Sequence, residues 1–395
     1  MSYFSGSPCL RASRYLNLRY FMKNIGIYIH IPFCKSKCLY CDFCSHAPRE
    51  GERQAYIDAL VAHIASYRDR LSRYVADTVY FGGGTPTLLS PGEISGILDA
   101  VRDAVCMDKN AEITIECNPA TASKPAFEQL RTAGVNRISI GAQSLNDGEL
   151  KALGRLHTAE QFVSTFKDAR AAGFDNISLD LMYGIPGQTR ESWAATLDAA
   201  LSLEPQHVSA YGLRVEQGTP FGNMGDALLL PDEDETAQMY LDAVEKLADA
   251  GIERYEISNF ACQGRESRHN IKYWKRDEYV GFGVAAHSFF EGKRYAAPQS
   301  FDRFVSGEWL DADSVTEVSE SDAEVEFVML AMRLRDGVDR DAYRARFGCY
   351  PDEKYAPRIK MYVERGYMIS DGRGFRFTDE GMLVSNSILA SILDI

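Results

Sequence analysis

The sequence predicts an α/β protein: a partial (β/α)6 barrel followed by a small C-terminal α+β domain of helix-plus-wing type. Apolar, strand-like runs alternate with helical patterns over residues 22–250. Alternation of this kind builds parallel sheets through right-handed crossovers. The 395 residues are enough for one large barrel and a smaller domain. With 45% hydrophobic and 25% charged residues, the composition is that of a globular protein.

The barrel elements are expected in a regular order along the chain. Six short apolar runs are the candidate strands, at residues 25–31, 78–81, 112–116, 137–140, 177–181 and 208–213. Helical periodicity marks residues 54–71, 91–104, 159–172, 192–203 and 237–250. The first strand carries isoleucine at every second position, so one face is fully apolar. Its other face, with Tyr28 and His30, is expected to line the barrel lumen.

The chain divides into four parts. Residues 1–21 contain three arginines, no acidic residue and no apolar core of signal-peptide length, and we expect a disordered extension or a start at Met22. Residues 22–250 form the barrel. Residues 251–316 are expected to close the barrel and connect it onward. Residues 317–395 mix helices with short strands, at 368–370 and 375–377, and form the C-terminal domain.

Charge and cysteine usage exclude several classes of protein. The net charge of −13 provides no global basic field to hold nucleic acid. No apolar run approaches the roughly 20 residues that a membrane-spanning helix needs. Nine cysteines spread over the chain do not suggest a disulfide framework, because the number is odd. We therefore expect a cytoplasmic protein that binds no nucleic acid.

Three cysteines follow the first strand closely. Cys34, Cys38 and Cys41 have the spacing Cys-x3-Cys-x2-Cys. Thiolates so spaced can ligate three irons of a [4Fe–4S] cluster, and because such clusters usually have four cysteine ligands, one iron stays open. A structural zinc site is the alternative, with Cys44 or His46 as fourth ligand. The cluster is favoured, because no second Cys/His pair occurs elsewhere in the chain.

Polar or glycine-rich segments also follow the other predicted strands, where working residues of parallel α/β barrels lie. Three glycines and a threonine follow the second strand, and bare glycines let a ligand approach backbone N–H groups. The candidate side chains at successive strand ends are Glu116, Gln143, Arg155 and Asp180. Each alone is more often a solvated or capping residue, but together they indicate a binding site.

The cysteine spacing resembles that of the radical S-adenosylmethionine (SAM) superfamily. From Met22 onward the chain resembles the HemN/HemW group of that superfamily. The matching segments are IYIHIPFCKSKCLYCDF, VYFGGGTPT, ECNP, RISIGAQS, LGRLH, LDLMYGIPGQT and RHNIKYW. Six strand–helix units is also the count of the partial radical SAM barrel, so the resemblance agrees with the predicted fold.

The resemblance implies two cofactors in the barrel. A [4Fe–4S] cluster would bind to Cys34, Cys38 and Cys41, with Tyr40 beside it. The residues implied to contact SAM are Tyr28, Gly83, Gly84, Thr85, Glu116, Gln143, Arg155 and Asp180. Charge complementarity places Arg155 near the SAM carboxylate and Asp180 or Glu116 near hydroxyl groups.

Two types of protein in the group differ in local motifs. The oxygen-independent coproporphyrinogen III dehydrogenase has a fourth cysteine where this chain has Phe43. The heme chaperone HemW has Asp-Phe after the third cysteine, as Asp42 and Phe43 are here, and a His-Asn-x-x-Tyr-Trp motif implicated in heme binding. That motif starts at His269, which we expect to ligate heme iron. Without the resemblance, a half-buried structural histidine is an equal alternative.

The resemblance therefore implies a heme chaperone that binds a [4Fe–4S] cluster, SAM and heme. Such a protein would pass heme to respiratory membrane proteins in transient contacts, and it would need an electron donor if SAM is cleaved. The alternative is an enzyme that cleaves SAM to a 5′-deoxyadenosyl radical and oxidatively decarboxylates coproporphyrinogen III to protoporphyrinogen IX. A plain electron carrier is disfavoured, because it needs neither the glycine run nor the polar strand ends.

Overall fold

A curved sheet of twelve strands dominates the computed structural model, which describes residues 22–395. The predicted extension, residues 1–21, lies outside the described residues. Strands from β9 through β1 to β6 run parallel, and antiparallel strands extend both edges. In sheet order the strands are β12 (Thr316–Glu317), β11 (Lys293–Ala296), β10 (His287–Phe290), β9 (Tyr279–Phe282), β1 (Lys23–Ile31), β2 (Tyr74–Gly83), β3 (Cys106–Cys117), β4 (Arg137–Gln143), β5 (Ile177–Tyr183), β6 (His207–Gly212), β8 (Asn259–Ala261) and β7 (Glu253–Arg254).

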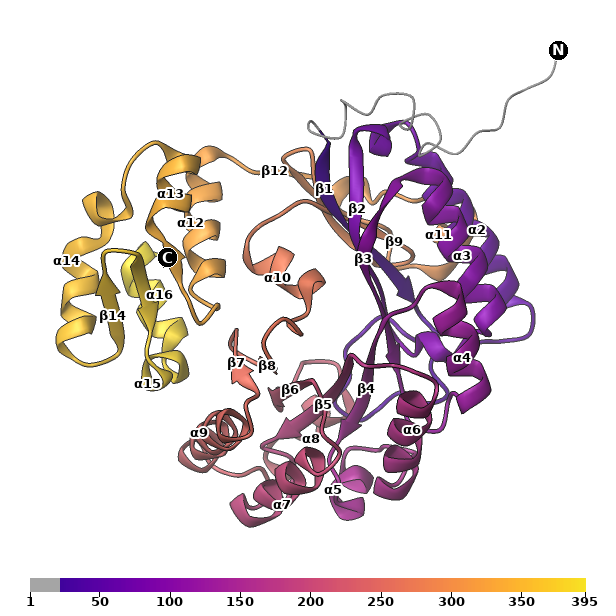
Figure 1. Cartoon of the computed structure of the whole chain (residues 1–395), viewed down its shortest axis with the longest axis horizontal. Coiled ribbons are helices and arrows are strands. Elements are labelled where there is room, and N and C mark those ends of the chain that lie inside the picture. Colours follow the sequence, from indigo (N-terminus) through magenta and orange to yellow (C-terminus); the bar gives the residue numbers. More distant parts are fainter. Residues whose placement is uncertain (1–21) are drawn as a thin grey trace.

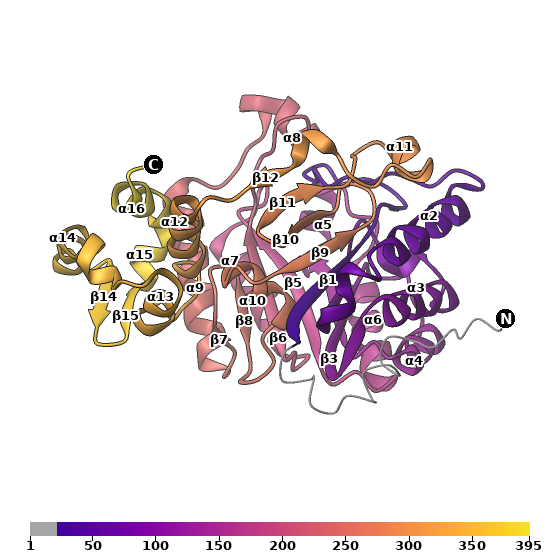
Figure 2. The same ribbon diagram turned by 90° about the horizontal axis from the view of Figure 1, so that it is seen from above.

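Helices cover the outer face of the parallel strands, while α10 lies on the inner side (Figure 1). The connecting helices are α2 (Glu52–Ser66), α3 (Pro91–Ala104), α4 (Lys124–Ala133), α5 (Asp147–Ala152), α6 (Ala159–Ala171), α7 (Arg190–Leu201), α8 (Pro220–Met224) and α9 (Glu233–Asp249). Two short helices follow, α10 (Arg268–Trp274) and α11 (Phe301–Val305). Seen from above, α2, α3 and α4 lie at the opposite end of the molecule from the C-terminal domain, and α9 lies beside that domain (Figure 2).

The predicted partial (β/α)6 barrel is confirmed, with the six expected strands observed as β1–β6. In β1 all four isoleucines of the apolar face are fully buried under the outer helices. The opposite face, with Tyr28 and His30, points into the lumen and packs against Tyr80 of β2 and the start of α10. The helix expected at residues 54–71 is α2, which ends earlier, at Ser66, before a short 3-10 turn at Arg70–Arg73.

Local sequence explains where the outer helices begin. Four of them start at a capping box, in which the N-cap side chain and the third helical residue satisfy each other's backbone N–H groups. The N-cap residues are Ser90, Thr158, Thr189 and Asp232. Because each of these helices starts at its N-cap, the cap also sets where the preceding loop ends.

The C-terminal domain has its own small sheet and core, as the sequence predicts. Its strands, in sheet order, are β13 (Val338–Asp339), β15 (Gly374–Phe377) and β14 (Met368–Asp371). Its helices are α12 (Glu320–Ala331), α13 (Arg340–Phe347), α14 (Pro351–Glu364), α15 (Asp379–Leu383) and α16 (Ser385–Leu393). Tyr240 of α9 packs into its apolar core, so the domain is docked on the barrel.

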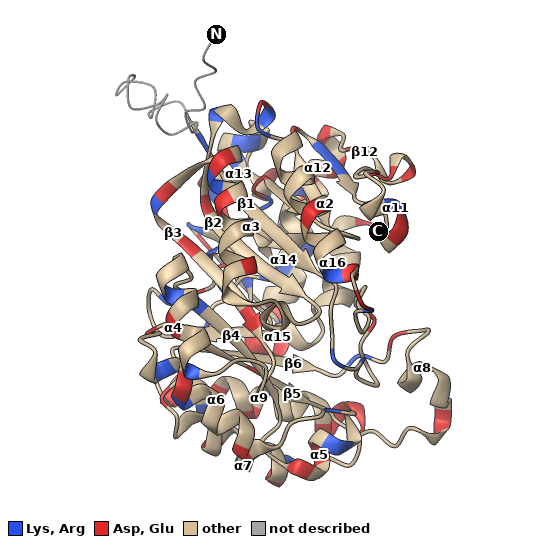
Figure 3. Cartoon of the chain, turned by 90° about the vertical axis from the view of Figure 1, so that its right-hand side faces the viewer, with Lys and Arg blue, Asp and Glu red and all other residues tan. Residues whose placement is uncertain are grey.

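The surface carries charges of both signs. Acidic and basic segments are intermixed on the outer helices (Figure 3). Among residues 22–395, no helix combines the length and the apolar character that crossing a bilayer requires.

Candidate functional site

The three cysteines lie in one loop at the carboxyl end of β1. Cys34 is buried and Cys38 and Cys41 are partly buried. A turn joins the last two, because the Cys41 N–H donates to the Cys38 carbonyl at 3.2 Å. Burial raises the pKa of the Cys41 thiol, and the proximity of Cys38 and Cys34 adds to this effect. Three neighbouring thiols ionise together only when positive charge compensates them, which is what bound iron supplies.

The fourth nearby cysteine points elsewhere. The Cys44 thiol donates to the carbonyl of Gln299 at 3.6 Å, and the His46 ring pairs with Glu52 at 3.2 Å. Within residues 22–395, no three His, Cys, Asp or Glu side chains gather as a single metal ion would require. The zinc alternative is therefore disfavoured, whereas thiols on three different irons of a cluster need not converge on one point.

The glycine run docks directly against the cysteine loop. The Gly84 N–H donates to the Ile31 carbonyl at 2.8 Å, and the Thr85 N–H donates to the Phe33 carbonyl at 2.7 Å. A Cβ on Gly84 would lie 2.6 Å from the Phe33 carbonyl oxygen, so no larger residue fits there. The Thr85 hydroxyl lies 3.7 Å from Cys34 Sγ. The second strand end thus lies beside the first cysteine.

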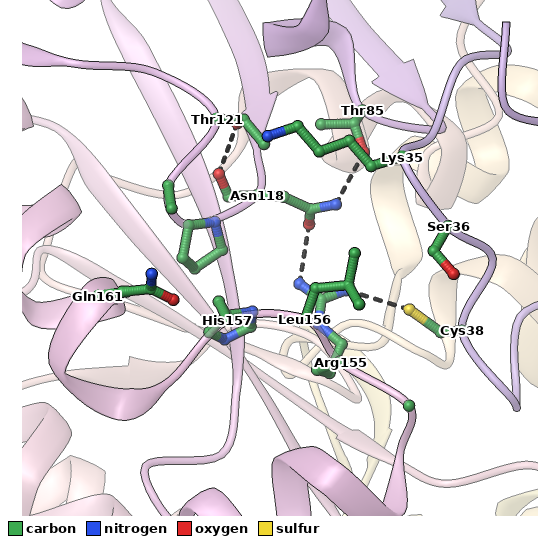
Figure 4. Close-up of a pocket in the computed structure, with 13 residues that line it drawn as sticks. Lys35, Ser36, Cys38, Thr85, Asn118, Thr121, Arg155, Leu156, His157 and Gln161 are labelled. Carbon is green, nitrogen blue, oxygen red and sulfur yellow. Dashed lines mark hydrogen bonds between the residues drawn. The ribbon is translucent and has the colours of Figure 1, made fainter.

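A chain of hydrogen bonds links Arg155 to Thr85, beside the cysteine loop (Figure 4). The Arg155 guanidinium donates to Asn118 Oδ1 at 2.9 Å, and Asn118 Nδ2 donates to Thr85 Oγ1 at 2.7 Å. Arg155 Nη1 also lies 3.5 Å from Cys38 Sγ. Arg155 Nε has no partner, although it is buried, so a donor remains for a carboxylate. Asn118 was not among the predicted site residues; its place directly after Glu116 and Cys117, at a strand end, was the available signal.

Two carboxylates line the lumen from the strands on either side of β4. Glu116 accepts hydrogen bonds from Tyr80 Oη at 2.9 Å and from the Gly83 N–H at 3.2 Å. Burial, together with the nearby charge of Asp180, raises the pKa of Glu116 to about 7. Asp180 accepts bonds from Ser139 Oγ at 2.9 and 3.1 Å. Both carboxylates keep lone pairs for hydroxyl donors, because each oxygen can accept more than one bond.

Gln143 ends β4 in an unusual conformation. Its φ angle is +65°, which is uncommon for a residue other than glycine and occurs often at functional sites. A Cβ on Gly141 would lie 3.0 Å from Gln143 Nε2 and 3.3 Å from Arg155 Nη2. The glycine therefore leaves room for both side chains at this strand end.

One cavity of about 310 Å³ brings most of the predicted residues together. It extends from the cysteine loop to the interior of the barrel. The predicted residues that line it are Cys34, Cys38, Tyr40, Cys41, Gly83, Gly84, Thr85, Glu116, Gln143, Arg155 and Asp180. A second cavity, of about 240 Å³, adjoins it on the outer side of Arg155 and Cys38 (Figure 4).

Tyr28 and His269 do not line this cavity. Tyr28 stacks on Tyr80, with ring centroids 6.3 Å apart, and its hydroxyl lies 3.1 Å from His30 Nδ1. His269 is 1% exposed, and its ring also stacks on Tyr80, with ring centroids 5.2 Å apart. Both ring nitrogens of His269 are hydrogen-bonded: Nδ1 to Thr78 Oγ1 and Nε2 to Tyr273 Oη, each at 2.8 Å. Neither nitrogen is free to bind iron in this arrangement.

The arrangement suits a cluster with one open corner and a zwitterionic, hydroxyl-bearing ligand beside it. Along one cavity, the thiols supply iron ligands, the unpartnered Arg155 Nε supplies a hydrogen-bond donor, and the two carboxylates supply acceptors. A three-thiol cluster supplies an iron without a protein ligand, to which the amino and carboxylate groups of SAM can bind. The residues present therefore fit both groups.

Comparisons with known proteins agree with this geometry. Residues 28–200 match the Radical SAM superfamily, and residues 318–384 match the HemN C-terminal domain. The chain is 33% identical over 372 residues to heme chaperone HemW of Bacillus subtilis (strain 168), covering 93% of this chain and 98% of that protein. It is 35% identical over 378 residues to heme chaperone HemW of Escherichia coli (strain K12), with the same coverage of 93% and 98%.

A mitochondrial protein of Mus musculus, radical S-adenosyl methionine domain-containing protein 1, is 33% identical over 384 residues, covering 93% of this chain and 87% of that protein. The solved structure of Escherichia coli coproporphyrinogen III oxidase HemN, described as a radical SAM enzyme, superposes with a TM-score of 0.81. It covers 95% of this chain and 91% of HemN at 22% identity, which shows a shared fold.

Fold and cysteine loop together are those of the radical SAM class. Within the HemN/HemW group of that class, the chain belongs to the HemW family.

Proposed function

We propose that this protein is a cytoplasmic heme chaperone of the radical SAM type. It binds a [4Fe–4S] cluster through Cys34, Cys38 and Cys41, SAM across the strand ends, and heme. It passes heme to respiratory membrane proteins in transient contacts. The observation that carries the proposal is the coexistence of the three-thiol cavity with the motif at His269, in a chain whose relatives are named heme chaperones.

Cluster and SAM occupy one continuous site in this proposal. Tyr40 lies beside the cluster, and its phenol is close to Cys38 and Arg155. Gly83, Gly84 and Thr85 would hold the amino group and carboxylate of SAM beside the cluster, and Arg155 Nε would donate to the carboxylate. Glu116 and Asp180 would accept hydrogen bonds from the ribose hydroxyls, and Gln143 would line the same side of the site. Tyr28 does not line the cavity; it supports Tyr80, on which it stacks and which does line the cavity.

Heme binds through His269 in the same proposal, and this requires a change in α10. Nε2 must exchange its bond to Tyr273 for the iron, and the ring must leave its stack on Tyr80. A helix of seven residues has little stability of its own, so its release from the barrel is feasible. Heme loading is thus coupled to opening of the lumen.

The test is an anaerobic comparison of two activities with the reconstituted protein. Heme is titrated into the protein, and its transfer to a heme-free acceptor such as apo-cytochrome b is followed by absorbance. In parallel, the protein is given SAM, a reductant and coproporphyrinogen III. We expect stoichiometric heme binding and transfer, and no protoporphyrinogen IX. Formation of protoporphyrinogen IX without heme transfer would replace the chaperone with the dehydrogenase.

A further inference from the structure

Arg137, the first residue of β4, is an unpaired cation inside the barrel. Only 2% of its surface is exposed, and its Nε has no hydrogen-bond partner. Every other buried cation in residues 22–395 has a carboxylate close to it. These pairs are Arg254–Asp379 at 2.6 Å, Lys272–Asp77 at 2.8 Å and Arg276–Glu326 at 2.7 Å. An uncompensated buried charge is strongly destabilising, so the position of Arg137 needs an explanation.

The guanidinium faces the cavity proposed for SAM. Arg137 lines that cavity at its deep end, with Ser139, His207 and Asn270. Its neighbour in the register of β3 is Thr114, whose buried hydroxyl oxygen also lacks a partner. Two unsatisfied polar atoms at one level of the barrel need an explanation from the other groups that line the cavity.

The charges that share this cavity with Arg137 are the carboxylates Glu116 and Asp180, which lie on β3 and β5, the strands on either side of β4. The phenol of Tyr80 donates to Glu116 at 2.9 Å, and its pKa is raised by burial, by Glu116 and by Asp180 and is lowered by Arg137. Burial and Asp180 also raise the pKa of Glu116 to about 7, and Arg137 opposes them. The titratable and charged groups that face Glu116 from the surrounding elements are Tyr28, Tyr80, Arg137, Asp180 and Tyr273.

We propose that Arg137 is the counter-charge of Glu116 and Asp180 and favours the ionised form of Glu116 on this side of the SAM cavity. It is a positioning residue that acts through Glu116, and the inference rests on the SAM site proposed above. An ionised Glu116 accepts hydroxyl donors on both oxygens, whereas a protonated one loses an acceptor and presents a donor instead. A separate anion site at Arg137 is disfavoured, because two carboxylates already outnumber the single cation.

The pH dependence of SAM affinity tests this role. The measurement is calorimetric titration of SAM into anaerobically reconstituted protein between about pH 6 and pH 9, with cluster content checked at each pH. Wild type should lose affinity as the pH falls through about 7. In Arg137→Gln the midpoint should rise by up to about 1 pH unit, because Arg137 is the smallest of the influences on Glu116. Affinity at neutral pH should then fall by up to roughly fivefold and recover near the alkaline end. Arg137→Lys should restore most of the wild-type profile.

A second set of variants separates this role from others. Glu116→Gln should remove the pH dependence, and adding Arg137→Gln to it should cost little more. A uniform loss at every pH in Arg137→Gln would mean direct contact with SAM and would overturn the proposal, as would an unchanged profile. Acetate binding that Arg137→Gln abolishes would instead make it an anion site.

The double variant with Glu116→Gln tests the charge compensation even if Arg137→Gln alone does not fold. If Arg137→Gln alone does not fold, the double variant with Glu116→Gln, which removes one charge of each sign, should fold and bind SAM weakly without pH dependence. A double variant that also fails to fold would contradict the proposed compensation. If wild type binds no SAM, the proposed function fails independently of Arg137.

Discussion

Cys44 lies three residues after Cys41 in sequence, yet its side chain is directed away from the site, toward the Gln299 carbonyl. Cys34, Cys38 and Cys41 instead lie in a loop that contacts the glycine run and Arg155. At the scale of single residues, orientation and neighbours therefore decide which thiol can hold iron. Sequence spacing alone had left Cys44 as a possible zinc ligand.

Serine substitutions test this difference between cysteines. Cys34→Ser, Cys38→Ser and Cys41→Ser should each lose most of the cluster, because a hydroxyl is a much weaker iron ligand than a thiolate. Cys44→Ser should keep wild-type iron and sulfide content after anaerobic reconstitution. Absence of the cluster in Cys44→Ser, with full occupancy in Cys38→Ser, would refute the ligand assignment.

Asn118 holds Arg155 and Thr85 in fixed positions, and Arg155 has a free donor for a carboxylate. Asn118→Ala should weaken SAM binding roughly tenfold to a hundredfold, which corresponds to losing a hydrogen bond to a charged group. Asn118→Asp should weaken it as well, since its carboxylate competes with that of SAM for Arg155. Equilibrium titration with SAM measures both, and unchanged affinity in both variants would show that Arg155 does not bind the carboxylate.

The element that the sequence described least well is α10. Its seven residues dock inside the barrel through groups from distant strands. Lys272 Nζ lies 2.8 Å from Asp77 Oδ1 in a buried pair, and the Glu112 carboxylate accepts the N–H groups of Arg268 and His269. These contacts make α10 part of the lumen wall, in contact with Tyr80 and hence with Glu116.

The motif at His269 can be tested with a matched pair of substitutions. His269→Ala removes the proposed iron ligand, so heme affinity should fall and the Soret band should shift, with cluster absorbance unchanged. Tyr273→Phe keeps the ring but frees Nε2 from its hydrogen bond. It should therefore bind heme at least as tightly as wild type. Heme titrations followed by absorbance measure both, and equal heme spectra in wild type and His269→Ala would refute ligation.

Sequence reasoning located the strands but not the arrangement of α10. The apolar runs of β1 to β6 are local signals, and the strand-end rule then placed Glu116 and Asp180 in one cavity. The partners of His269 lie far away in the chain, with Thr78 191 positions earlier, so no local pattern indicates its burial. Asn118 and Arg137 were missed for the same reason: Asn118 contacts Thr85 and Arg155, 33 and 37 positions away, and the proposed partners of Arg137 lie on the neighbouring strands.

At the scale of the whole molecule, a buried carboxylate lies where the barrel meets the C-terminal domain. Glu256 is fully buried and forms a β-bridge with Leu334. Its carboxylate lies near Asn259, but neither oxygen accepts a hydrogen bond of good geometry. Burial raises the pKa of Glu256 to about 7, despite the nearby Arg254. Arg254 is paired with Asp379 of the C-terminal domain at 2.6 Å.

This raised pKa makes the stability of the molecule depend on pH with a definite sign. Between about pH 4.5 and 7 the folded protein holds a proton on Glu256 that the unfolded chain releases. The unfolding free energy should therefore fall as pH rises through this range, by up to about 3 kcal/mol from this group. Glu256→Gln removes the titration and should be more stable than wild type above pH 7, with little difference near pH 5.

Denaturant unfolding of wild type and Glu256→Gln at several pH values measures this effect, because other titrating groups contribute equally to both proteins. Glu253→Gln is the matched control: its side chain is 55% exposed on the same edge of the sheet and pairs with Arg335 at the surface. Exposed pairs contribute little, so this variant should follow the wild-type pH profile. If Glu256→Gln also follows it, Glu256 is ionised in the folded protein. The contact between barrel and C-terminal domain would then have to contain a compensating cation, and Arg254, shared between Glu256 and Asp379, would be the group to substitute next.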